Sequence, residues 1–447
     1  MVGGLGSSQV FLSVLAELKR ADLLTVFPKN CTHKFDDVAQ DRRFRFFGNV
    51  NIGDGASPIP HSLSLPTSSI LHNYSHVLFA TGCTMPTLHS ALPPSQYCVP
   101  AISIVHWYTH HANAPPPPPL DTASHVSIIG NGNVSLDVAR ILLTNVDFLS
   151  KYDLPQSVLE VLSRSKIKHV SIIGRRGPLE AAFTMKELRE MMNLSEASMV
   201  PVHPSLLAPS MDSPPLTRQQ SRILQLIQQG SKNPPGSTLK TWSLDFFRSP
   251  VGLTPPTSTT PAQLSLAHTV VDPTTRRAIS TGEVSTIATD LVVTSLGFHA
   301  EVLQDFYDPT LRHLRSVAGR LVNAKGEVFQ NAYASGWAST GAKGVLASTM
   351  MNAYGVTDTI IADWKASFVD IPVANPQDST SNLRRQLNFN PVLDDIPEEV
   401  QTGLRDGKVT QYEDWKKVDA EELRRGKELG KERERMGWLE AHQFLRG

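Results

Sequence analysis

The chain has 447 residues, which is too long for one typical domain, so two or three domains are expected. Its 42 Lys and Arg residues balance its 42 Asp and Glu residues, so no overall basic field favours nucleic acid as a partner. No apolar run reaches the roughly 20 residues that span a bilayer, and we expect no transmembrane segment. The cysteines Cys31, Cys83 and Cys98 are widely spaced, which argues against a disulfide framework, a dithiol redox centre or a zinc site.

The first 29 residues indicate an incomplete nucleotide-binding unit. The glycine-rich stretch that ends at Ser8 is typical of a dinucleotide turn, and a helix over 9–20 and a strand over 23–27 are predicted to follow. Only two residues precede the first glycine, where a supporting strand of about 5 is usual. Gln9 stands where the third glycine belongs, and Pro28 stands where an acid would bind the ribose.

The next segments predict two strands and a linker. Residues 42–53 are typical of a strand and turn, and residues 76–82 of a buried strand closed by small residues. His110 and His111 then precede five prolines at 115–119. The histidines raise the alternative of a metal site, but no further ligand stands nearby, so we predict a solvated linker with a stiff polyproline spacer.

The clearest pattern is a strand, a glycine turn and a helix. Residues 125–129 form a buried apolar run, Gly130 and Gly132 follow at once, and helical periodicity begins near Asn133. This arrangement points backbone N–H groups and a helix N-terminus at a pyrophosphate, although an ordinary β–α turn is the alternative. The expected nucleotide contacts are Asn131, Gly132, Asn133 and Val134.

A second buried strand over 168–174 ends in Arg175 and Arg176. In a dinucleotide fold the end of this strand faces the adenosine ribose, where an acid accepts from a free 2′-hydroxyl and arginine accommodates a 2′-phosphate. The two guanidinium groups therefore favour NADP(H) over NAD(H). The alternative is a solvated basic turn.

Thr184 and Glu187 fit a capping box at the start of the next helix. Glu187 could instead touch the nicotinamide ribose, and sequence alone favours the cap. Beyond this helix, residues 201–216 and 231–262 are rich in Pro, Ser and Thr and predict surface loops. A helix over 217–228 carries Arg218 and Arg222 on one side. Further strands are predicted at 242–247, 269–272 and 290–297.

Near the C-terminal end, residues 333–337 lead through a glycine-bearing turn to a helix that begins near Gly344. Such a helix N-terminus favours negative charge on a bound group. The tail over 401–447 carries mixed charge with Trp415 and Trp438, and predicts exposed helices held by aromatic anchors.

Several motifs together resemble one family. The segments GNGNVSLDVARILL, GRRGP and AAFTMKELREM, followed in order by FRSP, YASGW and GVLASTM, are similar to the mitochondrial NADPH:adrenodoxin (ferredoxin) oxidoreductase family. The resemblance runs from about residue 30 to the C-terminus. It implies an α/β fold with two Rossmann-like dinucleotide-binding domains, the NADP-binding domain inserted into a discontinuous FAD-binding domain. The implied boundaries are 1–105 for the first part of the FAD domain, 106–327 for the NADP domain, and 328–447 for the second part with a helical tail.

The resemblance implies electron flow from NADPH through FAD to an acidic ferredoxin- or adrenodoxin-type iron–sulfur protein. Asp137 matches an acid implicated in electron transfer near the flavin–nicotinamide contact, and its alternative is an exposed acid stabilised by the helix dipole. Basic residues that meet the iron–sulfur partner match Arg189, Arg218 and Arg222, with solvated helix charge as the alternative. The implied FAD contacts are Ser8, Val50, Trp337, Gly344, Val345 and Leu346.

Three features of the sequence bear on the FAD site, the related enzymes and the location that the resemblance implies. A family loop that lines the flavin is absent before Lys29, so we expect weak FAD binding and keep a non-catalytic NADPH-binding protein as the alternative. A related enzyme with its own iron–sulfur segments would need clustered cysteines, which this chain lacks. The family implies a monomer in the mitochondrial matrix or peripheral to the inner membrane, although the first residues lack the Arg-rich pattern of a transit peptide.

Overall fold

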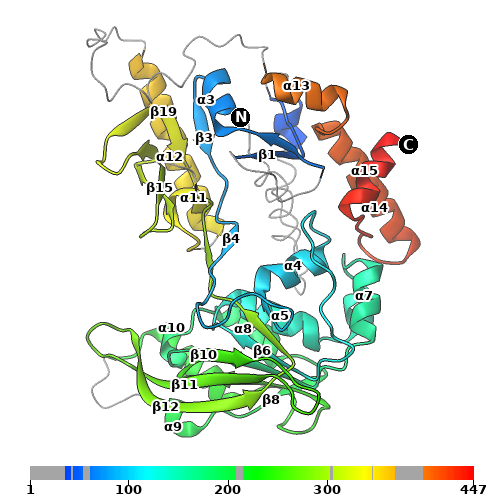
Figure 1. The fold of residues 1–447 in the computed structure, drawn as a ribbon, viewed down its shortest axis with the longest axis vertical. Coiled ribbons are helices and arrows are strands. Elements are labelled where there is room, and N and C mark those ends of the chain that lie inside the picture. The colour runs from blue at the N-terminus through cyan, green and yellow to red at the C-terminus, as the bar shows by residue number, and fades with distance from the viewer. Residues whose placement is uncertain are drawn as a thin grey trace. The chain divides into compact units, whose positions relative to one another are not determined.

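The computed structural model describes residues 36–41, 44–53, 61–207, 215–302, 306–344, 346–367 and 396–447. The chain divides into two compact units (Figure 1). Unit 1 comprises Met1–Met85, Phe298–Glu421 and Trp438–Gly447, and unit 2 comprises Pro86–Gly297 and Glu422–Gly437. The predicted N-terminal nucleotide unit, including Ser8, and the predicted flavin contact Val345 lie outside the described residues.

A six-stranded parallel sheet forms the centre of unit 2, in the order β5-β13-β6-β7-β9-β8. The strands are β5 (Cys98–Pro100), β6 (His125–Ile129), β7 (His169–Ile173), β8 (Ala197–Met199), β9 (Lys240–Asp245) and β13 (Leu291–Thr294). Ile128 and Ile172 are fully buried in the two middle strands, as expected for a parallel sheet covered on both faces. The chain leaves β6 in one direction and later returns to its other side, so the sheet has a topological switch point beside β6.

The helices of unit 2 connect and cover these strands. They are α4 (Ala101–Thr109), α5 (Asn133–Leu143), α6 (Val146–Leu149), α7 (Gln156–Ser163), the 3-10 turn η1 (Pro178–Glu180), α8 (Met185–Met192), α9 (Pro204–Leu207) and α10 (Arg218–Gln229). The helix predicted from Asn133 is α5, whose apolar residues Val138 and Ile141 are buried. α10 begins with a complete capping box between Thr217 and Gln220, which satisfies its first donors.

An antiparallel sheet in the order β10-β11-β12 packs on part of the parallel sheet. Its strands are β10 (Arg248–Thr254), β11 (Gln263–Val271) and β12 (Ala278–Ala288). Leu264 and Leu266 of β11 share a core with Ile129 and Ile173 at the ends of β6 and β7. The predicted loop over 231–262 is therefore wrong for 240–245 and 248–254, which form β9 and β10, whereas residues 255–262 lie outside helices and strands.

The predicted solvated linker is part of the folded unit 2. His111 stacks on His106 of α4 with ring centroids 3.9 Å apart, and His110 ends that helix in the left-handed conformation. The five prolines, 115–119, line a cavity of about 640 Å³ together with Tyr97. The prolines do not form a free spacer, because they line this cavity within unit 2, although Pro116, Pro117 and Pro119 remain exposed. No group of three metal-ligating side chains occurs among the described residues.

Unit 1 contains a four-stranded sheet in the order β17-β18-β19-β3, in which β19 pairs with β3 in parallel. The four strands of this sheet are β3 (Val77–Phe79), β17 (Ser316–Val317), β18 (Arg320–Val322) and β19 (Val328–Ala334). Two further pairs in unit 1 are β1 (Val50–Ile52) with β2 (Leu63–Leu65), and β15 (Tyr307–Asp308) with β16 (His313–Leu314). The strands β4 (Met85–Pro86) and β14 (Phe298–His299) pair where the chain passes between units. Phe79, Phe306 and Phe329 pack ring to ring in its core.

The helices of unit 1 are α3 (Thr67–Asn73), α11 (Trp337–Thr340), α12 (Leu346–Ser367), α13 (Glu398–Arg405), α15 (Trp438–Arg446) and the first part of α14 (Tyr412–Glu428). Asp363 ties α12 to the sheet, because it accepts two bonds from Arg320 and one from the Tyr333 hydroxyl at 2.6–3.0 Å. Among the described residues, no helix combines the length and apolar character that would span a membrane.

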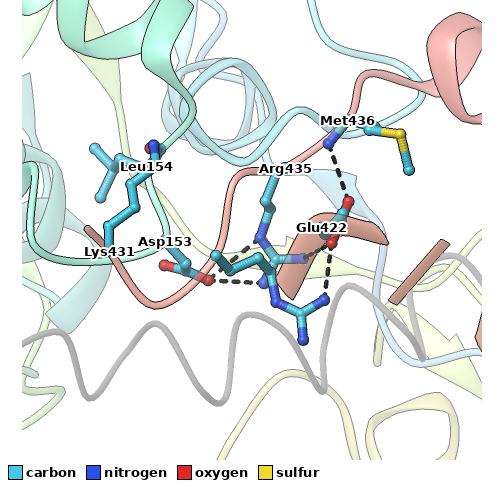
Figure 2. A network of polar contacts seen from close by, with 7 residues as sticks. Asp153, Leu154, Glu422, Lys431, Arg435 and Met436 are labelled. Carbon is cyan, nitrogen blue, oxygen red and sulfur yellow. Dashed lines mark hydrogen bonds and ion pairs between the residues drawn. The ribbon is translucent and has the colours of Figure 1, made fainter. Parts of the chain in front are cut away.

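The return segment, Glu422–Gly437, is held in unit 2 by buried charged groups (Figure 2). Arg435 donates to Asp153 through Nη2 at 2.7 Å and Nε at 3.2 Å. Lys431 donates to the Leu154 carbonyl at 2.7 Å, and both Lys431 and Glu422 are more than nine-tenths buried. The tail is thus anchored by ions as well as by aromatic contacts such as Trp438 on His61.

The chain passes from one compact unit to the other at Met85/Pro86 and Gly297/Phe298, and not at the predicted boundaries 105/106 and 327/328. β5 joins the parallel sheet of unit 2, so the segment that precedes residue 106 already belongs there. Leu314 and Leu321 lie in the core of unit 1, so the chain has left unit 2 well before residue 327.

Candidate functional site

The turn after β6 is built for close approach by a ligand. Gly130 has φ +130°, and a Cβ there would overlap the Ser295 carbonyl oxygen, so only glycine fits. Gly132 is the N-cap of α5, and no side chain caps this helix terminus. The first N–H groups of a helix have no partner inside the helix, so α5 presents donors and partial positive charge at the switch point of the sheet.

Two asparagines brace this turn. The Asn131 side chain lies against Gly174 at the end of β7, where a Cβ would collide with it. Asn131 Oδ1 is buried and has no hydrogen-bond partner among the described residues. Asn133 Oδ1 accepts from the Thr184 N–H at 2.8 Å, which joins the turn to the start of α8. The orphaned amide oxygen marks a polar position that a bound group can satisfy.

Arg175 and Arg176 follow β7 directly. Their backbone is fixed, because Thr269 Oγ1 donates to the Arg175 carbonyl at 2.8 Å and the Phe247 N–H donates to the Arg176 carbonyl at 3.4 Å. Arg175 is exposed and Arg176 is half-buried, and within the described ranges neither pairs with an acid. Two guanidinium groups without a counter-ion on a fixed backbone suit an anion.

A cluster of acids surrounds one buried arginine between α5 and α8, which pack together. Arg140 is 5% exposed and its Nη2 contacts Asp137 Oδ1 at 2.5 Å, while its Nη1 pairs with Glu190. Burial raises the pKa of Asp137 to about 6; Arg140 and Lys186 oppose the rise and Glu187 adds to it. Asp137 can therefore exchange a proton near neutral pH, which an ordinary exposed acid on a helix does not do.

The predicted capping box at Thr184 and Glu187 is wrong. Thr184 is the N-cap of α8, but its side chain makes no capping bond, and its backbone N–H, which Glu187 would accept in the box, donates to Asn133 of the neighbouring helix. Glu187 instead has a buried Oε2 with no hydrogen-bond partner in the described part of the chain. A buried carboxylate oxygen without a donor is costly unless a ligand supplies one.

Arg189, Arg218 and Arg222 are exposed on two helices that contact each other, α8 and α10. None of the three makes an ion pair within the described ranges. Their guanidinium groups therefore give unit 2 a local positive surface although the whole chain is neutral.

The described flavin candidates all lie in unit 1. Val50 is 2% exposed within the core, so a ligand there would meet its backbone. Trp337 is 37% exposed and begins α11 after Gly336, which has φ +63°. Gly344 has φ +88° and directly precedes the segment where Leu346 opens α12. Glycine turns before two helix starts provide backbone donors for an anionic or polar group.

Sequence reasoning missed Arg140, Glu190 and His89. Arg140 follows Asp137 by three positions and Glu190 follows Glu187 by three, so both spacings place the pairs on one helix face. That spacing is the signal that could have found them. His89 carries no motif, and only the fold brings it near Arg175.

A Rossmann-like parallel sheet with a glycine turn, an uncapped helix and two arginines after the second strand defines a dinucleotide-binding α/β protein. No protein-family model matches the chain. It is 30% identical over 438 residues to the mitochondrial NADPH:adrenodoxin oxidoreductase of Bos taurus, covering 94% of this chain and 81% of that relative. It is also 30% identical over 341 residues to the NADPH-ferredoxin reductase FprA of Mycobacterium tuberculosis, covering 74% and 71%.

The solved structure of Mycobacterium tuberculosis FprA in complex with NADPH matches with a TM-score of 0.72 at 26% identity, over 100% of this chain and 98% of that one. The chain belongs to the NADPH:adrenodoxin oxidoreductase family. The predicted resemblance and the predicted α/β class with Rossmann-like domains are confirmed.

Proposed function

We propose that the chain is an oxidoreductase that takes electrons from NADPH and passes them through FAD to a ferredoxin- or adrenodoxin-type iron–sulfur protein. The observation that carries the proposal is the edge of unit 2, where an uncapped helix, two arginines without an acidic partner and two orphaned buried oxygens gather around one glycine turn. Membership in the family supplies the reaction class, and the relatives are named as NADPH-dependent reductases.

The NADPH would be held by the residues around this turn. Gly132 and the first turn of α5, with Asn131, Asn133 and Val134, bind the pyrophosphate through backbone donors. Arg175 and Arg176 bind the 2′-phosphate. Glu187 offers its orphaned oxygen to a ribose hydroxyl, which would satisfy a group that is otherwise unpaired.

We assign Asp137 to the end of the site where the nicotinamide ring reacts. Its carboxyl group holds a proton below a pKa of about 6 and carries charge above it. Together with Glu187 it places negative charge beside α5, and negative charge stabilises a nicotinamide ring that becomes cationic as it gives up a hydride. Arg140 keeps the Asp137 side chain in one orientation.

Unit 1 would hold the FAD, which when bound accepts an electron pair and returns single electrons. The backbone around Val50 and Trp337 and the start of α12 at Gly344 and Leu346 would line it, with Val345 and Ser8 as further predicted contacts. The N-terminus of a long helix favours negative charge on the reduced ring. We accordingly assign unit 1 to FAD and unit 2 to NADPH, in place of the residue boundaries predicted from sequence.

The partner surface is the group of exposed arginines on α8 and α10, Arg189, Arg218 and Arg222. An acidic iron–sulfur protein would dock there by charge complementarity. The mitochondrial relatives support a mitochondrial location, and we propose a monomer in the matrix or peripheral to the inner membrane.

The proposal is tested by mixing the purified chain with ferredoxin and cytochrome c and measuring the reduction of cytochrome c. NADPH should support cytochrome c reduction only when ferredoxin is present, and NADH should support it poorly. If ferredoxin adds nothing while NADPH reduces a small acceptor, the partner assignment is wrong.

The alternative is a non-catalytic NADPH-binding protein, which the departures at Gln9 and Pro28 favour. These residues lie outside the described ranges. We expect the purified chain to contain less than one FAD per chain and to gain activity when FAD is added. A tightly bound full equivalent of FAD would contradict the expected weakness, and NADPH binding without any FAD binding would favour the alternative.

A further inference from the structure

His89 is fixed at the edge of the parallel sheet where the strands end. It lies in the connection that leads to β5, and its carbonyl accepts from the Leu92 N–H at 3.0 Å. Leu92 is 1% exposed and packs with Ile129 and Ile173, the last residues of β6 and β7. The short turn therefore places His89 beside the ends of the two strands that carry the glycine turn and the paired arginines.

A backbone hydrogen bond sets the tautomer of the ring. The Ala91 N–H donates to His89 Nδ1 at 3.2 Å, so Nδ1 is an acceptor and the neutral ring carries its hydrogen on Nε2. Within the described residues, Nε2 has no hydrogen-bond partner. The ring thus presents an unused donor.

Arg175 is the charged group that acts on this ring. Burial lowers the pKa of His89, and the Arg175 guanidinium lowers it further. Neither His89 nor Arg175 nor Arg176 is paired with an acid in the described part of unit 2. Arg175 therefore acts on a ring that becomes cationic on protonation, and this arrangement is unfavourable until an anion binds between them.

We propose that His89 is a third contact for the 2′-phosphate of NADP(H), and that binding of this phosphate draws a proton onto its ring. The inference rests on the proposed NADPH site and deepens it. A phosphate between the ring and Arg175 reverses the local field, so the imidazolium becomes the favoured form and donates a charge-assisted bond through Nε2. The preference for NADP(H) over NAD(H) consequently depends on pH.

The test is isothermal titration of the purified full-length protein with NADP⁺ and NAD⁺ at about pH 6, 7 and 8, spanning the ordinary titration range of histidine. The variants are His89→Gln, which keeps a neutral donor, and His89→Arg, which keeps a cation at every pH. His203→Gln is the matched control, because His203 Nδ1 also accepts from the backbone N–H two residues on, at 3.3 Å. His203 follows β8, which is separated from β7 by β9.

We expect His89→Gln to weaken NADP⁺ binding about 5- to 10-fold at pH 6, and less at pH 8 where the wild-type ring is also neutral. This loss of affinity is smaller than that for a fully buried charged contact because the His89 ring is partly exposed to water. NAD⁺ affinity should not change, and His203→Gln should leave both affinities unchanged. His89→Arg should bind NADP⁺ tightly and lose the histidine-dependent part of the pH profile.

The 2′-phosphate of NADP⁺ itself titrates near pH 6. Its contribution is the same in both proteins, so the difference in proton uptake between the wild type and His89→Gln isolates the histidine. Titrations in buffers of different ionisation enthalpy should show greater proton uptake by the wild type than by His89→Gln. Equal uptake by both proteins, or equal losses of NADP⁺ and NAD⁺ affinity in His89→Gln, would overturn the inference.

The underlying site is tested separately with Arg175→Ala/Arg176→Ala. If that variant loses NADP⁺ selectively while His89→Gln matches the wild type, only the role of His89 is wrong. If the wild type binds NAD⁺ as tightly as NADP⁺, the proposed 2′-phosphate site is wrong as well.

Discussion

Replacing Arg140 with leucine removes the centre of the ion cluster between α5 and α8. Arg140 is 5% exposed, and the side chains it pairs, Asp137 and Glu190, are 24% and 14% exposed. Removing one partner of a buried ion pair costs about 3–5 kcal/mol, because the remaining charge stays desolvated. We expect a loss near the lower limit, about 3 kcal/mol, since Asp137 can take up a proton and is partly open to water.

The assay is hydrogen exchange of peptides that cover α5 and α8, combined with the urea midpoint. Arg140→Leu should open these helices, whereas Arg164→Leu, at an exposed position after α7, should not. The double variant Arg140→Leu/Glu190→Leu should recover much of the loss, because it removes both charges of one pair. A single variant as stable as the wild type, or a double variant no more stable than the single one, would show that the Arg140 ion pairs do not stabilise these helices.

The same cluster predicts a pH dependence. The pKa of Asp137 is raised by burial to about 6, above its value in the unfolded chain, so the folded state binds the extra proton. Its contribution to stability is therefore fully present below the unfolded pKa and is lost as the pH rises through about 6. Arg140 lowers this pKa, so Arg140→Leu should move the loss to higher pH. An unchanged profile in Asp137→Asn would show that another group titrates.

Three further predictions concern the cofactor, the partner and acid stability. Arg175→Ala/Arg176→Ala should weaken NADPH binding by about 10- to 100-fold and leave NADH nearly unchanged, measured by equilibrium titration. Arg189→Glu should slow ferredoxin reduction in a salt-dependent way but spare a small uncharged acceptor, and equal loss with both acceptors would point to the NADPH site instead. Burial lowers the pKa of His106 to about 3 and that of His169 to about 4, so the stability they contribute above their unfolded pKa is lost as the pH falls from about 6.5 toward these values. His169→Gln should flatten that part of the urea midpoint profile, and a profile identical to wild type would contradict the assignment.

The elements with strong local signals were predictable from the sequence. The apolar runs at 125–129 and 168–174 became β6 and β7, and the periodic stretch from Asn133 became α5, because each pattern matches one way of burying its apolar residues. The helix that carries Arg218 and Arg222 was likewise predicted. These predictions depend on neighbours in the chain and need no tertiary information.

The errors arose where tertiary contacts outweigh local composition. Residues 278–288, for which no element was predicted, form a long strand although their side chains are mostly exposed, because pairing with β11 and not burial holds them. The proline run lines a cavity within unit 2, which composition does not reveal. Thr184 has the residue type for a cap, yet Asn133 from another helix takes its N–H.

In the candidate site, too, some residues could be found from local sequence and others only from the fold. Arg175 and Arg176 could be singled out because they follow a recognisable strand. The pairing of Arg140 with Glu190 and the approach of His89 to Arg175 join distant segments, and only the folded chain brings them together.

Electron flow from NADPH through FAD to ferredoxin is tested most directly by an anaerobic visible-absorption titration of the chain after it has been supplied with FAD. We expect a bound flavin spectrum that NADPH bleaches, that NADH bleaches poorly, and that oxidised ferredoxin restores. A bound flavin that NADPH leaves oxidised, or that NADH reduces equally well, would contradict it.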